Sequence, residues 1–142
     1  EQKTEKPKPP IQTEAQPLSF IATALQKFPS YRNGMEPHFL DGQYWLCSKE
    51  DFKKVVEHDW TNQKKAISDL YDCENYSMAF KVAVNNDFGL NNIGIVIDND
   101  SHHAYNIVVY SDGTAEIFEP QSDMFGIIGS ENYRFEKGII LI

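Results

Sequence analysis

The chain has 142 residues, 41% of them hydrophobic, which suits one ordinary domain with a core large enough to fold unaided. Its formal net charge of -8 at pH 7 argues against nucleic acid as a partner, because nucleic-acid-binding surfaces concentrate Lys and Arg. No apolar run approaches the length needed to cross a bilayer, so we expect no membrane span.

Residues 1–16 are rich in Pro, Lys, Glu and Gln, so we expect a disordered linker there and a single folded domain over residues 17–142. A Lys- and Pro-rich spacer in a chain without an initial Met is what trimming of an export signal or a lipid-anchored Cys leaves. We therefore expect an exported protein, secreted or surface-anchored. A glycosylation sequon at Asn75, within a predicted helix, favours a bacterial source.

The first part of the chain has a mainly helical pattern up to about residue 87. Phe20, Ile21 and Leu25 are spaced for one face of a helix that Pro29 closes. Four helices are predicted, and they begin at Pro17, after a Ser48–Asp51 capping box, after Thr61, and near Asp72 with an end at Asn85–Asn86.

The second part changes to a period of two, with β-branched and aromatic residues. Strands are predicted at residues 93–97, 105–110, 115–118 and 133–142. Helices followed by an antiparallel sheet make an α+β plan, with the N-terminal helices packed on the C-terminal sheet.

Cys73 opens the fourth predicted helix and is one of only two cysteines, the other being Cys47. Backbone N–H groups and the positive end of the helix dipole favour a thiolate at that position and suit a developing oxyanion. The flanking Asp72 and Glu74 raise the thiol pKa unless they point away or bind a cation. The alternative is a small buried hydrophobic residue. The chain has no CxxC pair and no HExxH motif, so neither a zinc knuckle nor a zincin-type metalloprotease is supported. We assign no residue as a metal ligand.

The register of a predicted hairpin decides whether His103 meets a carboxylate. With Gly113 in the left-handed position of a three-residue loop, Tyr105 pairs with Glu119 and His103 with Gln121. His103 and Glu119 then share one face, whereas a two-residue turn separates them. Cys73, His103 and Glu119 together form a candidate catalytic triad, in which the base deprotonates the thiol and the acid orients the base. Solvated residues at strand ends are the alternative.

These motifs resemble the papain-like and transglutaminase-like cysteine hydrolase superfamily: a helix-borne Cys73, the strand start His103-Ala104-Tyr105-Asn106, and Glu119-Pro120-Gln121. Within it they look most like the papain-like C-terminal domain of fungal agglutinins and related bacterial and phage proteins. The resemblance implies a papain-like α+β fold, a Cys-His-Glu triad, and peptide-bond hydrolysis with calcium dependence.

The leading hypothesis is therefore a thiol-dependent amide hydrolase, a cysteine peptidase or amidase that acts on a peptide or a cell-wall amide. A catalytically inactive binding domain of the same fold is the alternative, and acyl transfer is a third. Gln121 and Gln43 are candidates for contacts with substrate or oxyanion. The triad itself needs no cofactor. Calcium is expected from the resemblance, and a loose acidic set of Asp87, Asp98 and Asp100 suits it, although charged turn tips are the commoner explanation of such a set.

Overall fold

The computed structural model describes residues 7–59, 61 and 70–142. Its elements, in chain order, are β1 (Glu14–Pro17), α1 (Leu18–Leu25), β2 (Met35–His38), β3 (Gln43–Leu46), α2 (Lys49–His58), α3 (Cys73–Phe88), β4 (Ile93–Asp98), β5 (His103–Val109), β6 (Ala115–Glu119), β7 (Met124–Phe125) and β8 (Gly138–Leu141). None of the helices among these residues is long and apolar enough to span a membrane.

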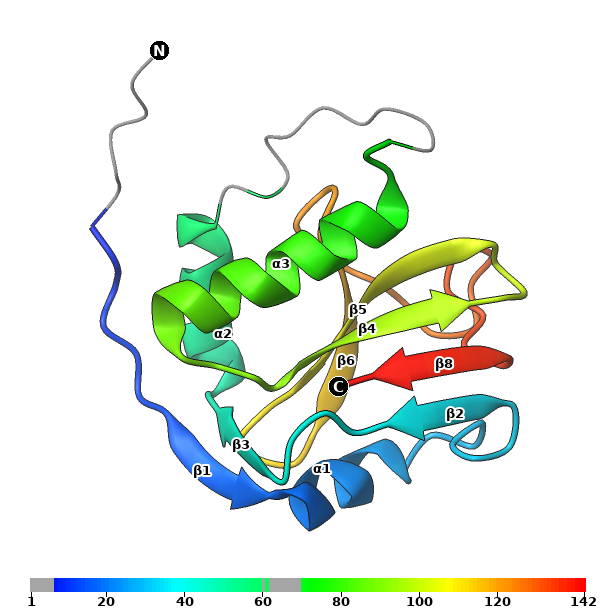
Figure 1. The fold of residues 1–142 in the computed structure, drawn as a ribbon, viewed down its shortest axis with the longest axis horizontal. Coiled ribbons are helices and arrows are strands. Elements are labelled where there is room, and N and C mark those ends of the chain that lie inside the picture. Colours follow the sequence, from blue (N-terminus) through cyan, green and yellow to red (C-terminus); the bar gives the residue numbers. More distant parts are fainter. Residues whose placement is uncertain (1–6, 60, 62–69) are drawn as a thin grey trace.

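A six-stranded sheet forms the centre of the fold, in the order β2-β8-β4-β5-β6-β7 (Figure 1). Strands β2 and β8 run parallel, and the other neighbours run antiparallel. Strands β1 and β3 form a separate antiparallel pair. Of the N-terminal strands, only β2 thus joins the central sheet, whose other strands come from the second half of the chain.

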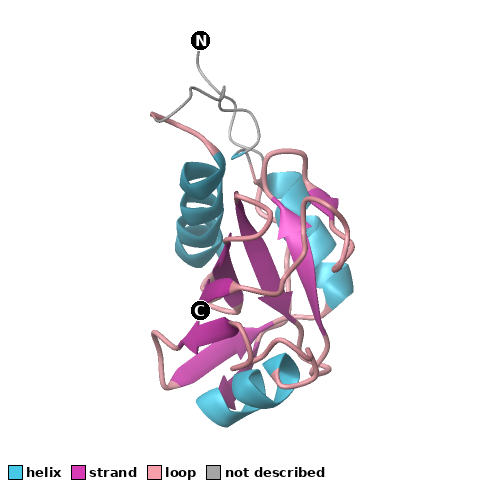
Figure 2. Cartoon of the chain, turned by 90° about the vertical axis from the view of Figure 1, so that its right-hand side faces the viewer, coloured by secondary structure: helices cyan, strands magenta, loops and turns pink. Residues whose placement is uncertain are grey.

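Both faces of the sheet are buried, because helices lie on both sides of it (Figures 1 and 2). Helix α1 packs Ile21 and Leu25 with Ile107 and Ile117 on one face. Helices α2 and α3 pack on the other face, in a second cluster that includes Phe52, Phe80, Val108 and Phe118. Alternate side chains of β5 and β6 therefore enter different cores.

The predicted arrangement, N-terminal helices packed on a C-terminal antiparallel sheet, is wrong in three respects. The central sheet is mixed, it includes β2 from the first third of the chain, and the helices cover both of its faces. The linker prediction also fails for Glu14, Ala15 and Gln16, which pair with β3. Backbone pairing with a distant strand orders these polar residues although they have little to bury.

Most predicted helices are confirmed within a few residues. Helix α1 lies in the predicted segment, and Ser48 Oγ caps α2 by accepting from the Asp51 N–H at 3.1 Å. Helix α3 begins with a capping box between Asp72 and Asn75. The helix ends at Phe88 and not at the predicted Asn85–Asn86. The residue that ends it is Gly89, which has the left-handed conformation of a C-terminal cap, with φ at 69°. The third predicted helix, after Thr61, falls mostly outside the described residues.

The hairpin of β5 and β6 has the predicted three-residue register. Asn106 pairs with Phe118 and Val109 with Ala115, while Gly113 has φ at 84°. The last predicted strand is shorter than expected, because only Gly138–Leu141 pair with β4. The confirmed register matters most for the site, because it brings the start of β5, with His103, next to the end of β6, with Glu119.

Candidate functional site

A cleft of about 440 Å³ lies where the start of α3 meets the β4–β5 turn. Cys73 is the first residue of α3, and its side chain is half-buried beside the start of β5. The lining residues are Cys73, Glu74, Ile97, Asp98, Asn99, His102, His103 and Ala104. The structure thus places the predicted thiol and the predicted base at the same cleft.

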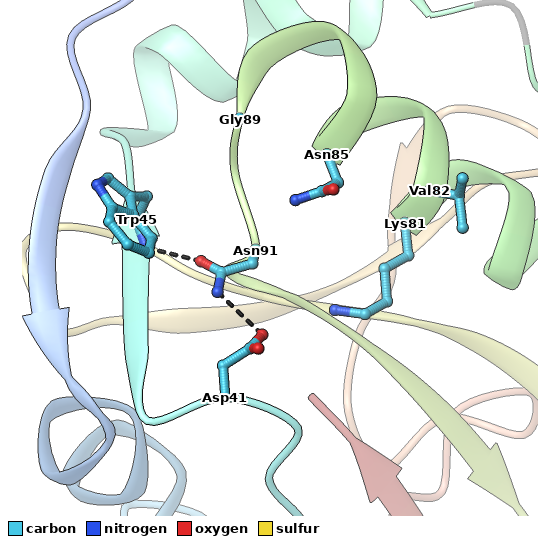
Figure 3. Close-up of a pocket in the computed structure, with 7 residues that line it drawn as sticks. All are labelled: Asp41, Trp45, Lys81, Val82, Asn85, Gly89 and Asn91. Atoms are coloured by element: carbon cyan, nitrogen blue, oxygen red, sulfur yellow. Dashed lines mark hydrogen bonds between the residues drawn. The ribbon is translucent and has the colours of Figure 1, made fainter.

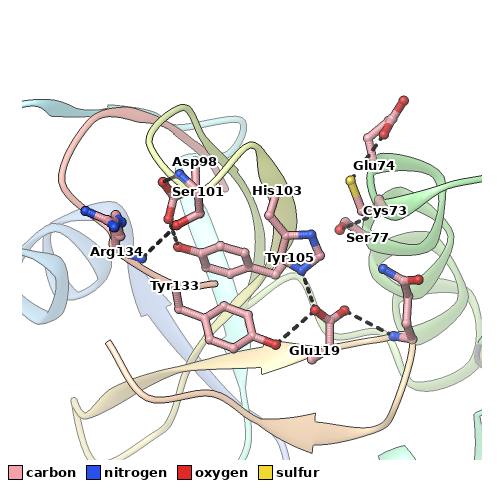
Figure 4. Close-up of polar contacts among 11 residues, drawn as sticks. Cys73, Glu74, Ser77, Asp98, Ser101, His103, Tyr105, Glu119, Tyr133 and Arg134 are labelled. Atoms are coloured by element: carbon pink, nitrogen blue, oxygen red, sulfur yellow. Dashed lines mark hydrogen bonds and ion pairs between the residues drawn. The ribbon is translucent and has the colours of Figure 1, made fainter. Parts of the chain in front are cut away.

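His103 and Glu119 form a tight pair, with 2.5 Å between Nε2 of the imidazole and Oε1 of the carboxylate (Figure 4). Glu119 also accepts a hydrogen bond from the Tyr133 hydroxyl at 3.0 Å and one from the Gln121 backbone N–H at 3.3 Å. These contacts fix the orientation of a carboxylate that is only 8% exposed. The imidazole is therefore held by Nε2, and within the described part of the chain no group hydrogen-bonds to its Nδ1.

A second carboxylate, Asp98, braces the turn that carries His103 (Figure 4). Its oxygens accept from the Tyr105 hydroxyl at 2.6 Å, from the Phe135 N–H at 2.9 Å and from the Ser101 N–H at 3.1 Å. Burial alone would raise the pKa of Asp98, but these hydrogen bonds outweigh burial and lower it. Asp98 is therefore an ionised structural anchor at neutral pH.

The thiol of Cys73 points to a different partner from the one that the sequence predicts. Its Sγ lies 3.5 Å from Oε2 of Glu74, to which it donates, and no hydrogen bond joins it to the His103 ring. Burial raises the pKa of the thiol, and Glu74 and Asp72 raise it further, although a backbone hydrogen bond at Ala104 opposes them. The thiol therefore stays protonated at neutral pH.

The other predicted contact residues lie elsewhere or act through the backbone. Gln121 contributes its N–H to Glu119. Gln43 begins β3 and is not among the residues that line the cleft. Cys47 is a free, fully buried cysteine, and burial raises the pKa of its thiol to about 12. Its inert thiol fits a core residue.

The calcium prediction finds no support among residues 7–59, 61 and 70–142, which contain no group of three His, Cys, Asp or Glu side chains able to hold a metal ion. Asp98, a member of the predicted acidic set, already accepts three hydrogen bonds within the protein. A calcium requirement stays a prediction, which chelation with EGTA in a binding assay would check.

Three contributors to the site were not predicted in these roles. Tyr133 was assigned to a strand, and nothing in its neighbourhood signals a bond to Glu119. For Asp98 the sequence predicts either a calcium ligand or a charged turn tip, and not a buried acceptor for Tyr105 and Phe135. Glu74 was recognised as a charge that raises the thiol pKa, and its hydrogen bond with Cys73 makes that effect direct.

Comparisons with known proteins identify the family. The model of the ricin-type beta-trefoil lectin C-terminal domain matches residues 13–142. The chain belongs to this family. A search of curated proteins gave no match.

Solved structures agree on the fold. The PSL1a-E64 complex matches with a TM-score of 0.69 and 23% identity, over 90% of this chain and 51% of the other. A structure of Polyporus squamosus lectin, bound to the human-type influenza-binding epitope Neu5Acα2-6Galβ1-4GlcNAc, matches with a TM-score of 0.69 and 21% identity, over 90% of this chain and 49% of the other. This chain spans about half the length of either.

The comparisons correct the assignment made from the sequence. The chain is a lectin C-terminal domain and shares the fold of lectin structures, so the papain-like and transglutaminase-like assignment is wrong. The thiol-dependent amide hydrolase function and the peptide or cell-wall amide partner are overturned with it. The resemblance rested on short motifs around Cys73 and His103, and such local arrangements recur on folds with different functions. An inactive binding domain fits the comparisons better.

Proposed function

We propose that the chain is a non-catalytic, glycan-binding domain of a lectin-type protein, whose ligand contacts the cleft at Cys73 and His103. The observation that carries this proposal is the geometry at the thiol: it donates to Glu74 and makes no hydrogen bond to His103, whose Nε2 contacts Glu119. Burial and Glu74 raise the pKa of the thiol in keeping with this geometry. A protonated thiol is a poor nucleophile but a usable polar contact. The family match supports a lectin context.

The cleft offers a sugar hydroxyl group both donors and acceptors. Nδ1 of His103 bonds to none of the residues that the structure describes, while Nε2 is fixed by Glu119. Glu74 and Asn99 add a carboxylate and an amide at the rim. Ile97 and Ala104 add apolar side chains to the lining, as is usual in ligand sites with a few fixed polar groups. Cys73, His103 and Glu119 are then recognition and positioning residues.

The test combines glycan binding with thiol reactivity. Neu5Acα2-6Galβ1-4GlcNAc, the epitope in the lectin complex, and a panel of galactosides are titrated by calorimetry against the wild-type domain, His103→Ala and His38→Ala. His38 is exposed at the end of β2 and serves as the matched control. We expect at least one glycan to bind, with affinity about tenfold weaker for His103→Ala, which corresponds to about 1.4 kcal/mol. His38→Ala should bind like wild type.

In parallel, the alkylation rate of Cys73 by iodoacetamide is followed against pH. We expect slow alkylation with an apparent pKa above that of a free thiol, in wild type and in His103→Ala alike. Rapid alkylation that depends on His103, or a covalent E64 adduct on Cys73, contradicts a non-catalytic domain. Absence of binding to every glycan in the panel contradicts the glycan assignment. Export from the cell stays a prediction, to be checked by fractionation.

A further inference from the structure

A second cavity, of about 550 Å³, lies beside the C-terminal half of α3 (Figure 3). We call it the Trp45 pocket, and its lining residues are Asp41, Trp45, Lys81, Val82, Asn85, Gly89 and Asn91. Asn85 lies twelve positions after Cys73 in α3, which is about 18 Å along the helix axis. The Trp45 pocket is therefore separate from the cleft at Cys73.

Asn91 holds two sides of the Trp45 pocket in fixed positions (Figure 3). Its Oδ1 accepts from the Trp45 backbone N–H at 2.7 Å, and its Nδ2 donates to Oδ2 of Asp41 and to the Gln43 carbonyl, each at 3.0 Å. All of these contacts are within the protein, so the pocket does not depend on a ligand for its shape. Such preorganisation lowers the entropic cost of binding.

The Trp45 pocket carries one negative and one positive group that are available to a ligand. Asp41 is exposed, and only its Oδ2 is bonded to Asn91. The Lys81 ammonium donates to the Ile93 carbonyl at 2.5 Å, which leaves two of its three donors. The two charges balance, so the pocket favours a neutral ligand over a phosphate or a free cation.

The Trp45 pocket also exposes apolar side chains. Trp45 is 41% exposed and Val82 is 57% exposed. An exposed indole provides a flat apolar surface with one polar N–H, which matches the C–H face of a sugar ring. Asp41 accepts from hydroxyl groups, and Lys81 and Asn85 donate to hydroxyl oxygens.

We propose that the Trp45 pocket binds a single neutral hexopyranose residue, packed on Trp45 and hydrogen-bonded to Asp41 and Lys81. The volume lies within the ordinary range of small-molecule sites. This site does not rest on the proposed function, because it shares no lining residue with the cleft at Cys73.

The experiment titrates methyl hexopyranosides, of the galacto, gluco and manno series, against the Trp60→Phe variant. Trp45 is then the only tryptophan, so its emission reports on the pocket. We expect a saturable shift of the Trp45 emission with at least one glycoside, and an affinity at least tenfold weaker in Asp41→Asn. Glu50→Gln, an exposed acid on α2 outside the pocket, serves as the control and should leave the affinity unchanged.

Two results overturn the proposal. One is that no glycoside shifts the Trp45 emission or receives magnetisation in saturation-transfer NMR. The other is that lysine amide shifts the emission and the glycosides do not, since the site is then cation-binding. His103→Ala separates the two proposals: glycoside binding that is lost in His103→Ala but retained in Asp41→Asn overturns the second site alone. Binding retained in His103→Ala supports it.

Discussion

Removal of the Asp98 carboxylate should destabilise the domain through the donors that it leaves without a partner. In Asp98→Ala the Tyr105 hydroxyl, 0% exposed, and the Phe135 N–H, in a residue 2% exposed, both lose their acceptor. Each buried donor left without an acceptor costs about 1–3 kcal/mol, so we expect a loss of about 2–6 kcal/mol. The measurement is the free energy of unfolding from urea denaturation at pH 7.

The isosteric variant Asp98→Asn separates hydrogen bonding from packing. Its carbonyl oxygen still accepts from Tyr105 and Phe135, whereas its amide faces the Ser101 N–H without accepting from it. We expect a loss of about 1–2 kcal/mol. A double-mutant cycle with Tyr105→Phe measures the coupling, which should be about 1.5–3 kcal/mol for a bond to a charged acceptor. Losses below about 0.5 kcal/mol in both Asp98 variants refute the reasoning.

The same carboxylate sets a pH dependence. The pKa of Asp98 is lower in the folded state than in the unfolded chain, so its contribution is fully present above the unfolded pKa of about 4. It is lost as the pH falls through the lower, folded pKa. Asp98→Asn should therefore lose less stability than wild type between pH 5 and about pH 2. Parallel curves for the two proteins contradict this assignment.

Three further outcomes are expected. Gly138→Ala should destabilise the domain by at least about 2 kcal/mol, because a Cβ at φ 153° would lie 1.9 Å from the Ile97 carbonyl oxygen; an unchanged urea midpoint contradicts this. Phe52→Ala should cost about 3–5 kcal/mol in urea unfolding, since Phe52 is fully buried and its ring packs against four aromatic rings; a loss below 1 kcal/mol shows that the core refills the space. Burial and the nearby Asp59 raise the pKa of Asp123 to about 6, so its contribution to stability falls as the pH rises from about 4 to 6; Asp123→Asn should flatten that part of the stability curve, and an unaltered curve refutes the assignment.

Local signals in the sequence were sufficient for the helices and for one hairpin. Ser48 and Asp51 predict the start of α2 because their hydrogen bond is formed within one turn. The register of β5 and β6 was predictable because only a three-residue loop, with Gly113 at positive φ, keeps Ile107 and Ile117 on the same buried face. That register also placed His103 and Glu119 close together.

The missed strands lack such local signals. Strand β2 has the sequence Met-Glu-Pro-His, and it forms because β8, about a hundred residues later in the chain, pairs with it. Strand β1 is similar, since it depends on β3. Long-range pairing of short polar segments leaves no periodicity in the sequence, so helices were predicted where strands also lie. The contact between Tyr133 and Glu119 depends on such long-range folding too.

The function prediction was wrong because the balance of charges at the thiol depends on side-chain directions that a motif does not fix. A helix start favours a thiolate by about 0.3–1 kcal/mol, which is a modest effect at a partly exposed position. Burial opposes this effect, and the neighbouring Glu74 carboxylate accepts a hydrogen bond from the protonated thiol. The net shift of the Cys73 pKa is therefore upward. Substitution of Glu74 is therefore more informative than substitution of His103. If Glu74→Gln lowers the apparent pKa of Cys73 below that of a free thiol, one side chain keeps this site from nucleophilic chemistry; if the pKa stays high, burial together with Asp72 does so.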